Sequence, residues 1–249
     1  MIRTRFEMCN QHRSETGSSL TSVAAVESFS SETQRAHVAH LCLFVGIDER
    51  EGKLDLPAAN FLFYPDDHVS ENQSAFDRDP TNAFPLLLFS FPSAKDPDWE
   101  RRHPGKATAE VFTYIDNYDL FSAWEGEEWS KRGEDYQKMK DEIAERMLGV
   151  LLEYHPELRG RIDYYELSTP LSTEWFSAYQ RGELYGLDHT PERLQQDWLT
   201  PRTRIPGLWL TGQDVLTCGV TGAMMAGMLT VVAMVGGRKI GPLMKQIYA

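Results

Sequence analysis

The sequence predicts a mixed α/β fold of α+β character, built on a mostly antiparallel sheet. Short segments rich in β-branched and aromatic residues, separated by Pro, Gly and Asp turns, fill the first half of the chain. One long segment with apolar residues at helical spacing follows them. With 249 residues and 41% hydrophobic content, the chain can fill the core of one large domain or two small ones.

Five segments have the length and composition of strands. The first ends near Gly46, and the second is closed by the turn residues Pro65, Asp66 and Asp67. The third is apolar enough to lie at the centre of a sheet. In chain order the expected strands are Val38–Ile47, Asn60–Tyr64, Leu86–Phe91, Ala109–Tyr114 and Ile162–Leu167.

The segment Glu134–Tyr154 predicts a long amphipathic helix, which Pro156 ends. Its apolar residues recur every three or four positions and therefore share one face. That face is expected to cover the sheet, and it consists of Met139, Ile143, Met147, Val150, Leu151 and Tyr154.

Composition excludes several classes of function. A formal net charge of −12 disfavours binding to nucleic acid and argues against a polybasic surface for membranes, because phosphate groups require a basic surface. The three cysteines, Cys9, Cys42 and Cys218, lack the spacing of metal ligands, and an odd number of cysteines cannot all pair in disulfides. They indicate a reducing, cytoplasmic location, no disulfide framework and no metal centre.

Two segments could be mistaken for membrane or targeting elements. The first residues of the chain carry charges and no long apolar run follows them, which argues against a secretory signal. A stretch rich in Ser, Thr and Glu predicts that residues 1–35 form a flexible lead-in. Val215–Gly237 lacks charged residues and contains the small-residue pair Ala223 and Gly227. Its glycines and threonines favour a buried helix over a membrane span, with peripheral membrane contact as the alternative.

The most informative segment is Ile205–Asp214 with the glycine-rich stretch after it. Leu208–Leu210 predicts a short buried strand, and Gly212-Gln213-Asp214 predicts a turn. Gly219 and Gly222 then allow close backbone approach at the start of a helix, where free N–H groups favour an anion. The alternative is that these glycines only allow tight helix packing.

The amino-acid sequences of five motifs resemble those of one protein family. Gly207-Leu-Trp-Leu-Thr-Gly-Gln-Asp214 is similar to the C-terminal flavin motif of the phytoene desaturase, carotenoid isomerase and retinol saturase group of oxidoreductases. The other motifs occur in the order expected for that group, and the resemblance spans about residues 38–237. They are Phe91–Trp99 with His103–Gly105, Lys131–Tyr136, Glu166–Leu171 and Tyr185–Pro191.

This resemblance implies FAD as cofactor, with NAD(P) as a second candidate, and an isoprenoid or lipid-like polyene as substrate in an apolar tunnel. The residues implied near the substrate are Tyr185, Gly186 and Leu187. The residues implied at the flavin ribitol and diphosphate are Gly212, Gln213, Asp214, Gly219, Val220, Thr221, Gly222 and Ala223.

The family opens with a Gly-x-Gly-x-x-Gly dinucleotide motif that this sequence lacks. We therefore expect a C-terminal fragment without the N-terminal dinucleotide-binding unit. Its expected parts are a lead-in over 1–35, a substrate domain over 36–200 and, over 201–249, the C-terminal remnant of a Rossmann-like FAD-binding domain.

No side chain stands out as an acid, base or nucleophile, which fits chemistry carried by a flavin. His189 could donate a proton, but Thr190 and Pro191 beside it predict a helix cap. Two alternatives stay open. The chain could be a non-enzymatic lid that pairs with a chain carrying the dinucleotide-binding half or with its own copy, or it could be a membrane-anchored interaction domain.

Overall fold

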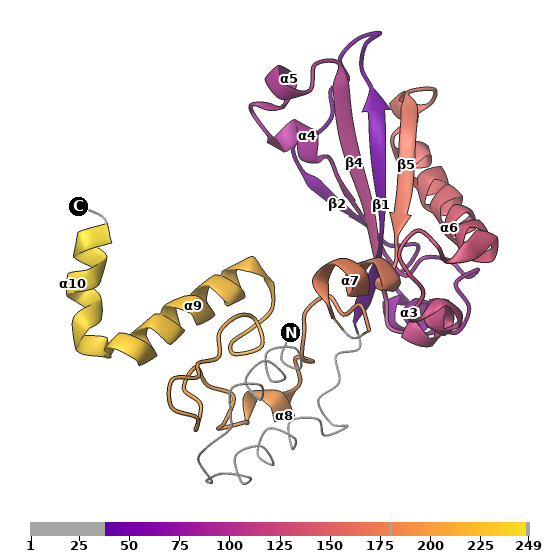
Figure 1. Ribbon diagram of the computed structural model, residues 1–249. Coiled ribbons are helices and arrows are strands. Elements are labelled where there is room, and N and C mark those ends of the chain that lie inside the picture. The colour runs from indigo at the N-terminus through magenta and orange to yellow at the C-terminus, as the bar shows by residue number, and fades with distance from the viewer. Residues whose placement is uncertain (1–37, 180, 248–249) are drawn as a thin grey trace. The chain divides into compact units, whose positions relative to one another are not determined.

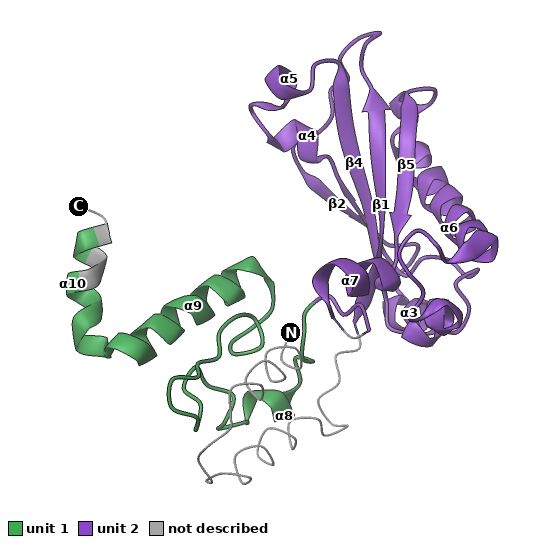
Figure 2. Cartoon of the chain, in the orientation of Figure 1, with its two compact units in different colours: residues 1–36, 185–249 green, residues 37–184 purple. Residues whose placement is uncertain are grey.

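The computed structural model describes residues 38–179 and 181–247. The chain divides into two compact units, with the boundary between Leu184 and Tyr185 (Figure 2). The sheet and its covering helices form the purple part of Figure 2, which we call the first unit, and the glycine-rich C-terminal segment lies in the green part, which we call the second unit. The lead-in expected over residues 1–35 lies outside the described residues.

The first unit is built on a five-stranded sheet with the strand order β2-β3-β4-β1-β5 (Figure 1). Every pair of neighbouring strands is antiparallel, as the sequence predicts. The observed strands agree with the five expected segments to within a few residues at each end. They are β1 (Ala39–Asp48), β2 (Asn60–Phe63), β3 (Leu87–Ser90), β4 (Lys106–Ile115) and β5 (Ile162–Ser168).

Alternating side chains explain how the sheet forms its core. Along β4 every second residue is buried, because successive side chains of a strand point to opposite faces. In register, Leu43 of β1 lies opposite Val111 of β4 and Leu167 of β5, and all three are buried. This face therefore forms one side of the hydrophobic core.

Helix α6 (Gly133–Tyr154) packs along the sheet and completes that core (Figure 1). Ile143, Met147 and Leu151 are buried, as the predicted apolar face requires. Tyr154 is 52% exposed, but its ring lies 4.9 Å from that of Phe63. The helix therefore confirms the predicted segment.

Shorter elements close the ends of the first unit. Phe76 of α3 is fully buried, and Thr169 forms a capping box with Ser172 at the start of α7. These elements are α3 (Val69–Arg78), α4 (Pro92–Lys95), α5 (Trp99–Arg102), η3 (Tyr118–Trp124), η4 (Pro156–Leu158) and α7 (Pro170–Ser177).

The described part of the second unit contains three helices, α8 (Pro191–Leu194), α9 (Gly219–Val235) and α10 (Gly237–Ile247). The buried strand predicted at Leu208–Leu210 is wrong. Only an isolated bridge between Arg202 and Trp209 forms, and Leu208 is 38% exposed. A strand needs a neighbour for its backbone hydrogen bonds, and none of the described residues of this unit forms a ladder with it.

The apolar segment that mimics a membrane span is α9 and its flanks. Among the described residues, no helix is both long enough and apolar enough to cross a membrane.

Candidate functional site

Asp214 joins two of the segments singled out by the sequence. Its Oδ1 accepts a hydrogen bond of 2.8 Å from the backbone N–H of Leu187. Gly186 is buried with φ +69°, and a Cβ built there would overlap the same carboxylate oxygen. The Tyr185–Leu187 loop and the Gly212–Asp214 turn therefore lie together, and a glycine is required where they meet.

Arg193 also links the Tyr185–Leu187 loop to the Gly212–Asp214 turn. It is only 3% exposed, and its guanidinium donates to the carbonyl oxygens of Leu187 at 3.0 Å, Gln213 at 2.9 Å and Asp214 at 2.8 Å. Sequence reasoning missed it, because an arginine in the first turn of a short helix is usually solvated. The signal that could have found it is its position three residues after the N-cap Thr190, where its backbone N–H meets the cap hydroxyl.

The cap interpretation of Thr190 and Pro191 is confirmed. The Thr190 hydroxyl accepts from the backbone N–H of Arg193 at 3.2 Å, and Pro191 occupies the first turn of α8. His189 beside them is exposed, and partial desolvation and the Arg193 charge lower its pKa. The cap thus places Arg193 where it reaches the carbonyl groups.

The Gly212 turn leads into the start of α9. Gly212 has φ +101° and Gly219 φ +83°, conformations that L side chains rarely adopt. The Gln213 side-chain oxygen accepts from the N–H of Gly219 at 3.4 Å. A Cβ on Gly222 would overlap the carbonyl oxygen of Thr217, so this glycine allows the chain to fold back on itself. The packing interpretation explains Gly222.

The first turn of α9 is open on its outer side. Val220 is 86% exposed and Thr221 is exposed, while Ala223 is half-buried. The first N–H groups of a helix have no partner within the helix. The amides that the resemblance implied at a cofactor therefore lie at an accessible helix start.

One side of α9 packs within its own unit. Ala226 is fully buried, and the Thr230 hydroxyl donates to the carbonyl oxygen of Leu210 at 2.9 Å. The opposite side carries an exposed apolar stripe at helical spacing. We refer to it as the α9 stripe, and it consists of Val220, Met224, Met228 and Val231.

In the first unit, the sheet face turned away from the core is also apolar and accessible. Phe44 is 45% exposed and Leu62 57% exposed. Phe112 is paired with Cys42 and Leu88 in neighbouring strands, and its ring stacks on His40 at 5.3 Å. Burial lowers the pKa of His40, which favours a neutral imidazole. We call this surface the open sheet face.

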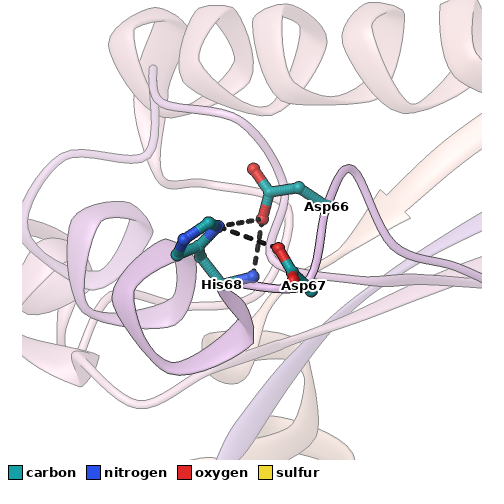
Figure 3. A group of neighbouring side chains, drawn as sticks. All are labelled: Asp66, Asp67 and His68. Carbon is teal, nitrogen blue, oxygen red and sulfur yellow. Dashed lines mark hydrogen bonds and ion pairs between the residues drawn. The ribbon is translucent and has the colours of Figure 1, made fainter.

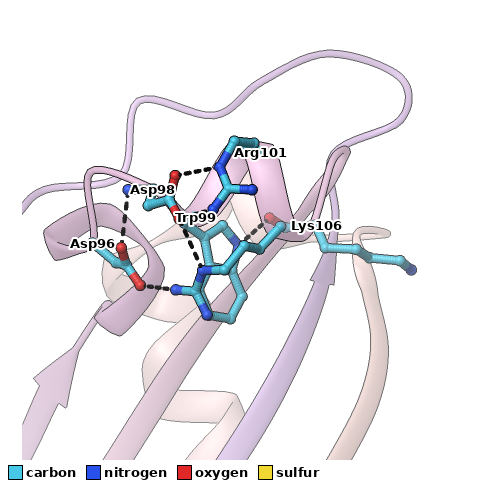
Figure 4. A network of polar contacts seen from close by, with 6 residues as sticks. Asp96, Asp98, Trp99, Arg101 and Lys106 are labelled. Atoms are coloured by element: carbon cyan, nitrogen blue, oxygen red, sulfur yellow. Dashed lines mark hydrogen bonds and ion pairs between the residues drawn. The ribbon is translucent and has the colours of Figure 1, made fainter.

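Within the motif Phe91–Trp99, the residues Asp96, Asp98 and Trp99 form a polar network with residues that follow them in the chain (Figure 4). The Trp99 indole N–H donates to the carbonyl oxygen of Lys106 at 2.7 Å, and Arg101 pairs with Asp98 at 2.6 Å. Arg102 pairs with Asp96. These contacts are mutually satisfied, so the structure gives this motif a role in ordering the loop before β4.

Two more of the motifs are tied together by hydrogen bonds. The hydroxyl groups of Tyr136 and Thr169 lie 2.7 Å apart in the interior, and Arg132 donates to the carbonyl oxygen of Leu171 at 3.2 Å. The start of α6 is thereby fixed to the end of β5 and the start of α7.

One group with metal-ligand chemistry occurs among the described residues, namely Asp66, Asp67 and His68 (Figure 3). All three are exposed, and Asp66 accepts from the N–H of His68 and the side-chain amide of Asn72, both at 2.8 Å. These bonds give Asp66 a structural task at the start of α3, and no metal role follows from the group.

Comparison with known proteins finds relatives that share the name all-trans-retinol 13,14-reductase. All-trans-retinol 13,14-reductase of Homo sapiens is 35% identical over 204 residues, which are 79% of this chain and 33% of that protein. The Danio rerio protein of the same name is 34% identical over 197 residues, covering 76% and 32%. An inactive all-trans-retinol 13,14-reductase of Danio rerio is 26% identical over 194 residues, covering 75% and 32%. No family model matches the chain.

The chain thus spans about a third of the length of the curated relatives it matches. The resemblance inferred from the motifs is confirmed: over about 78% of its length, the chain is homologous to all-trans-retinol 13,14-reductases, which are retinol saturases of the phytoene desaturase-like family.

Proposed function

We propose that this chain forms part of an FAD-dependent oxidoreductase that acts on a retinoid or a similar polyene. The relatives carry the name of a retinol reductase, and the Gly207–Asp214 motif resembles the C-terminal flavin motif of the phytoene desaturase group. In this proposal the second unit contributes the turn that binds the flavin ribitol and diphosphate, and the first unit contributes the open sheet face to the substrate site.

The observation that carries this proposal is the state of the Asp214 carboxylate. Its Oδ1 is held by the Leu187 N–H, while Oδ2 has no hydrogen-bond partner among the described residues. A fixed carboxylate with a free oxygen is suited to accept a hydroxyl of the ribitol chain. A Cβ on Gly212 or Gly219 would meet no atom within 4 Å, so the space beside this turn fits a group that approaches the backbone.

When bound, FAD would supply the electron transfer, with NAD(P) as the candidate electron donor. The residues of this chain would then bind and orient. Asp214 would accept a ribitol hydroxyl, the backbone amides of Val220 and Thr221 would donate to the diphosphate, and Arg193 would keep the turn in shape. The apolar groups of the open sheet face exclude water from the polyene.

A chimera tests the proposal. This chain replaces the matched third of the human relative, and bound flavin and reduction of all-trans-retinol are measured. We expect a yellow protein that saturates retinol. A folded chimera with full flavin content and no conversion of retinol or other polyenes would contradict the enzymatic part of the proposal.

A second candidate is a non-enzymatic partner of a chain that carries a dinucleotide-binding half. It is favoured by the relative named as inactive and by the exposed α9 stripe. Such a chain would bind the partner without conferring turnover. The same chimera distinguishes the two candidates, because the partner function predicts assembly and no product.

A further inference from the structure

A row of polar side chains crosses the open sheet face. Asn60, Ser90, Glu110, Phe44 and Glu166 lie opposite one another on the five neighbouring strands. Side chains in register on one face are neighbours, so the row is continuous except at the ring of Phe44. The next row on the same face is mainly apolar and consists of Leu62, Leu88, Phe112, Cys42 and Ser168.

The polar groups at both ends of this row have partners. Glu166 accepts from the Tyr164 hydroxyl at 2.5 Å and from Lys140 at 3.3 Å, and these contacts lower its pKa. At the other end, the Lys95 ammonium donates to Ser90 at 2.8 Å and to Asn60. Both ends of the row are therefore already stabilised by hydrogen bonds within the chain.

Glu110 in the middle of the row differs from both ends. Among the described residues, its carboxylate has neither a hydrogen bond nor an ion pair, although its side chain is half-buried. It lies between Ser90 and the exposed ring of Phe44. Its charge also acts on the apolar row, because burial and Glu110 together raise the pKa of the Cys42 thiol to about 12.

A half-buried carboxylate beside apolar side chains is costly unless a donor reaches it. A polyene that lies on Phe44 and Phe112 would bring no donor along its chain, since hydrocarbon has none. A terminal hydroxyl group would provide one, and a hydrogen bond from a neutral donor to a charged acceptor is among the stronger ones.

We infer that Glu110 accepts a hydrogen bond from the hydroxyl end of a polyene alcohol whose chain lies on the open sheet face. Glu110 is then the residue that makes the site select the free alcohol over its ether, its ester or a hydrocarbon. This inference rests on the proposed function, and it assigns the recognition of the polar end to one side chain.

The experiment compares the binding of all-trans-retinol and its methyl ether to the chain, followed by ligand fluorescence. The ether keeps the polyene but cannot donate a hydrogen bond. We expect the alcohol to bind about tenfold more tightly, the ratio that a net charged hydrogen bond supplies. In Glu110→Ala the two affinities become equal, mainly through weaker binding of the alcohol.

Two further variants complete the comparison. Glu110→Gln keeps the shape and an acceptor but removes the charge, so we expect roughly threefold selectivity for the alcohol. If the alanine variant fails to fold, the affinity ratio of Glu110→Gln alone tests the role of Glu110. Glu145→Ala, at an exposed carboxylate on α6, is the matched control and leaves the ratio unchanged.

The outcomes separate this inference from the function it rests on. Equal binding of alcohol and ether by the wild type, or full selectivity in both Glu110 variants, overturns the role of Glu110 and leaves the polyene site standing. Binding of neither ligand overturns the substrate role of the open sheet face, and the role of Glu110 with it.

Discussion

At the scale of single residues, Asp214, Gly186 and Arg193 form one small unit. Asp214 fixes the Leu187 amide, Gly186 leaves room for the carboxylate, and Arg193 binds three carbonyl oxygens from the two segments. Each contact depends on the others, because moving one segment breaks the bonds of both. Substitutions here are therefore expected to act on the loop as a whole.

The first prediction concerns Gly186→Ala. Its positive φ costs any L residue about 1 kcal/mol, and the overlap of the new methyl group with Asp214 adds roughly 1–3 kcal/mol. Gly207→Ala is the control, because its φ is +81° and its Cβ meets nothing within 4 Å. Limited proteolysis of residues 187–218 should be clearly faster in the Gly186 variant. Equal rates in the two variants would show that the overlap is relieved without cost.

The second prediction concerns Arg193→Met, which keeps much of the side-chain volume but removes every donor. Three carbonyl oxygens lose a charged hydrogen bond, so the loop should open more often. We expect amide exchange at Leu187 to rise at least tenfold, equivalent to about 1.4 kcal/mol. The exposed Arg204→Met should leave this exchange unchanged, and a matching rise there would remove the special role of Arg193.

At the scale of elements, periodicity explains what could be predicted. The strands follow from a hydrophobic pattern of period two, and α6 follows from one of period 3.6. Each pattern marks the face that an element buries against the core, so it can be read from the segment alone. The strand expected at Leu208–Leu210 failed, since a strand also needs a partner ladder that its own residues do not encode.

The candidate site was predictable only in part for a related reason. Gly186 and Asp214 were both singled out from their motifs, but their contact joins residues 28 positions apart and could not be inferred from spacing. Arg193 was missed because its burial depends on carbonyl groups that only the folded loop brings together. The motif at Asp96–Trp99 proved to be a structural network.

The third prediction concerns the α9 stripe. Exposed apolar side chains at helical spacing favour association, so we expect the isolated chain to self-associate. Met224→Lys with Met228→Lys should shift it towards the monomer in light scattering. Leu194→Lys, at a 73% exposed residue outside α9, is the control. A wild-type chain that is monomeric at all concentrations tested would show that the stripe does not drive association.

At the scale of the whole molecule, this chain corresponds to about a third of its relatives. It carries a flavin-like turn but no Gly-x-Gly-x-x-Gly motif, and in the family that motif holds the adenosine side of the dinucleotide. We therefore predict that the isolated chain binds FAD weakly or not at all. Titration followed by flavin fluorescence measures this, and a yellow protein with stoichiometric flavin would contradict it.

The most direct test of the central claim is the FAD affinity of the chimera with the human relative, with and without Asp214→Ala. The substitution leaves a ribitol hydroxyl unpaired and releases the Leu187 amide, which should cost roughly 1–3 kcal/mol of binding. The predicted result is an FAD dissociation constant at least roughly fivefold higher than that of the parent chimera, while the exposed Asp197→Ala leaves it unchanged. An Asp214→Ala chimera with unaltered FAD affinity would contradict the cofactor role of this turn.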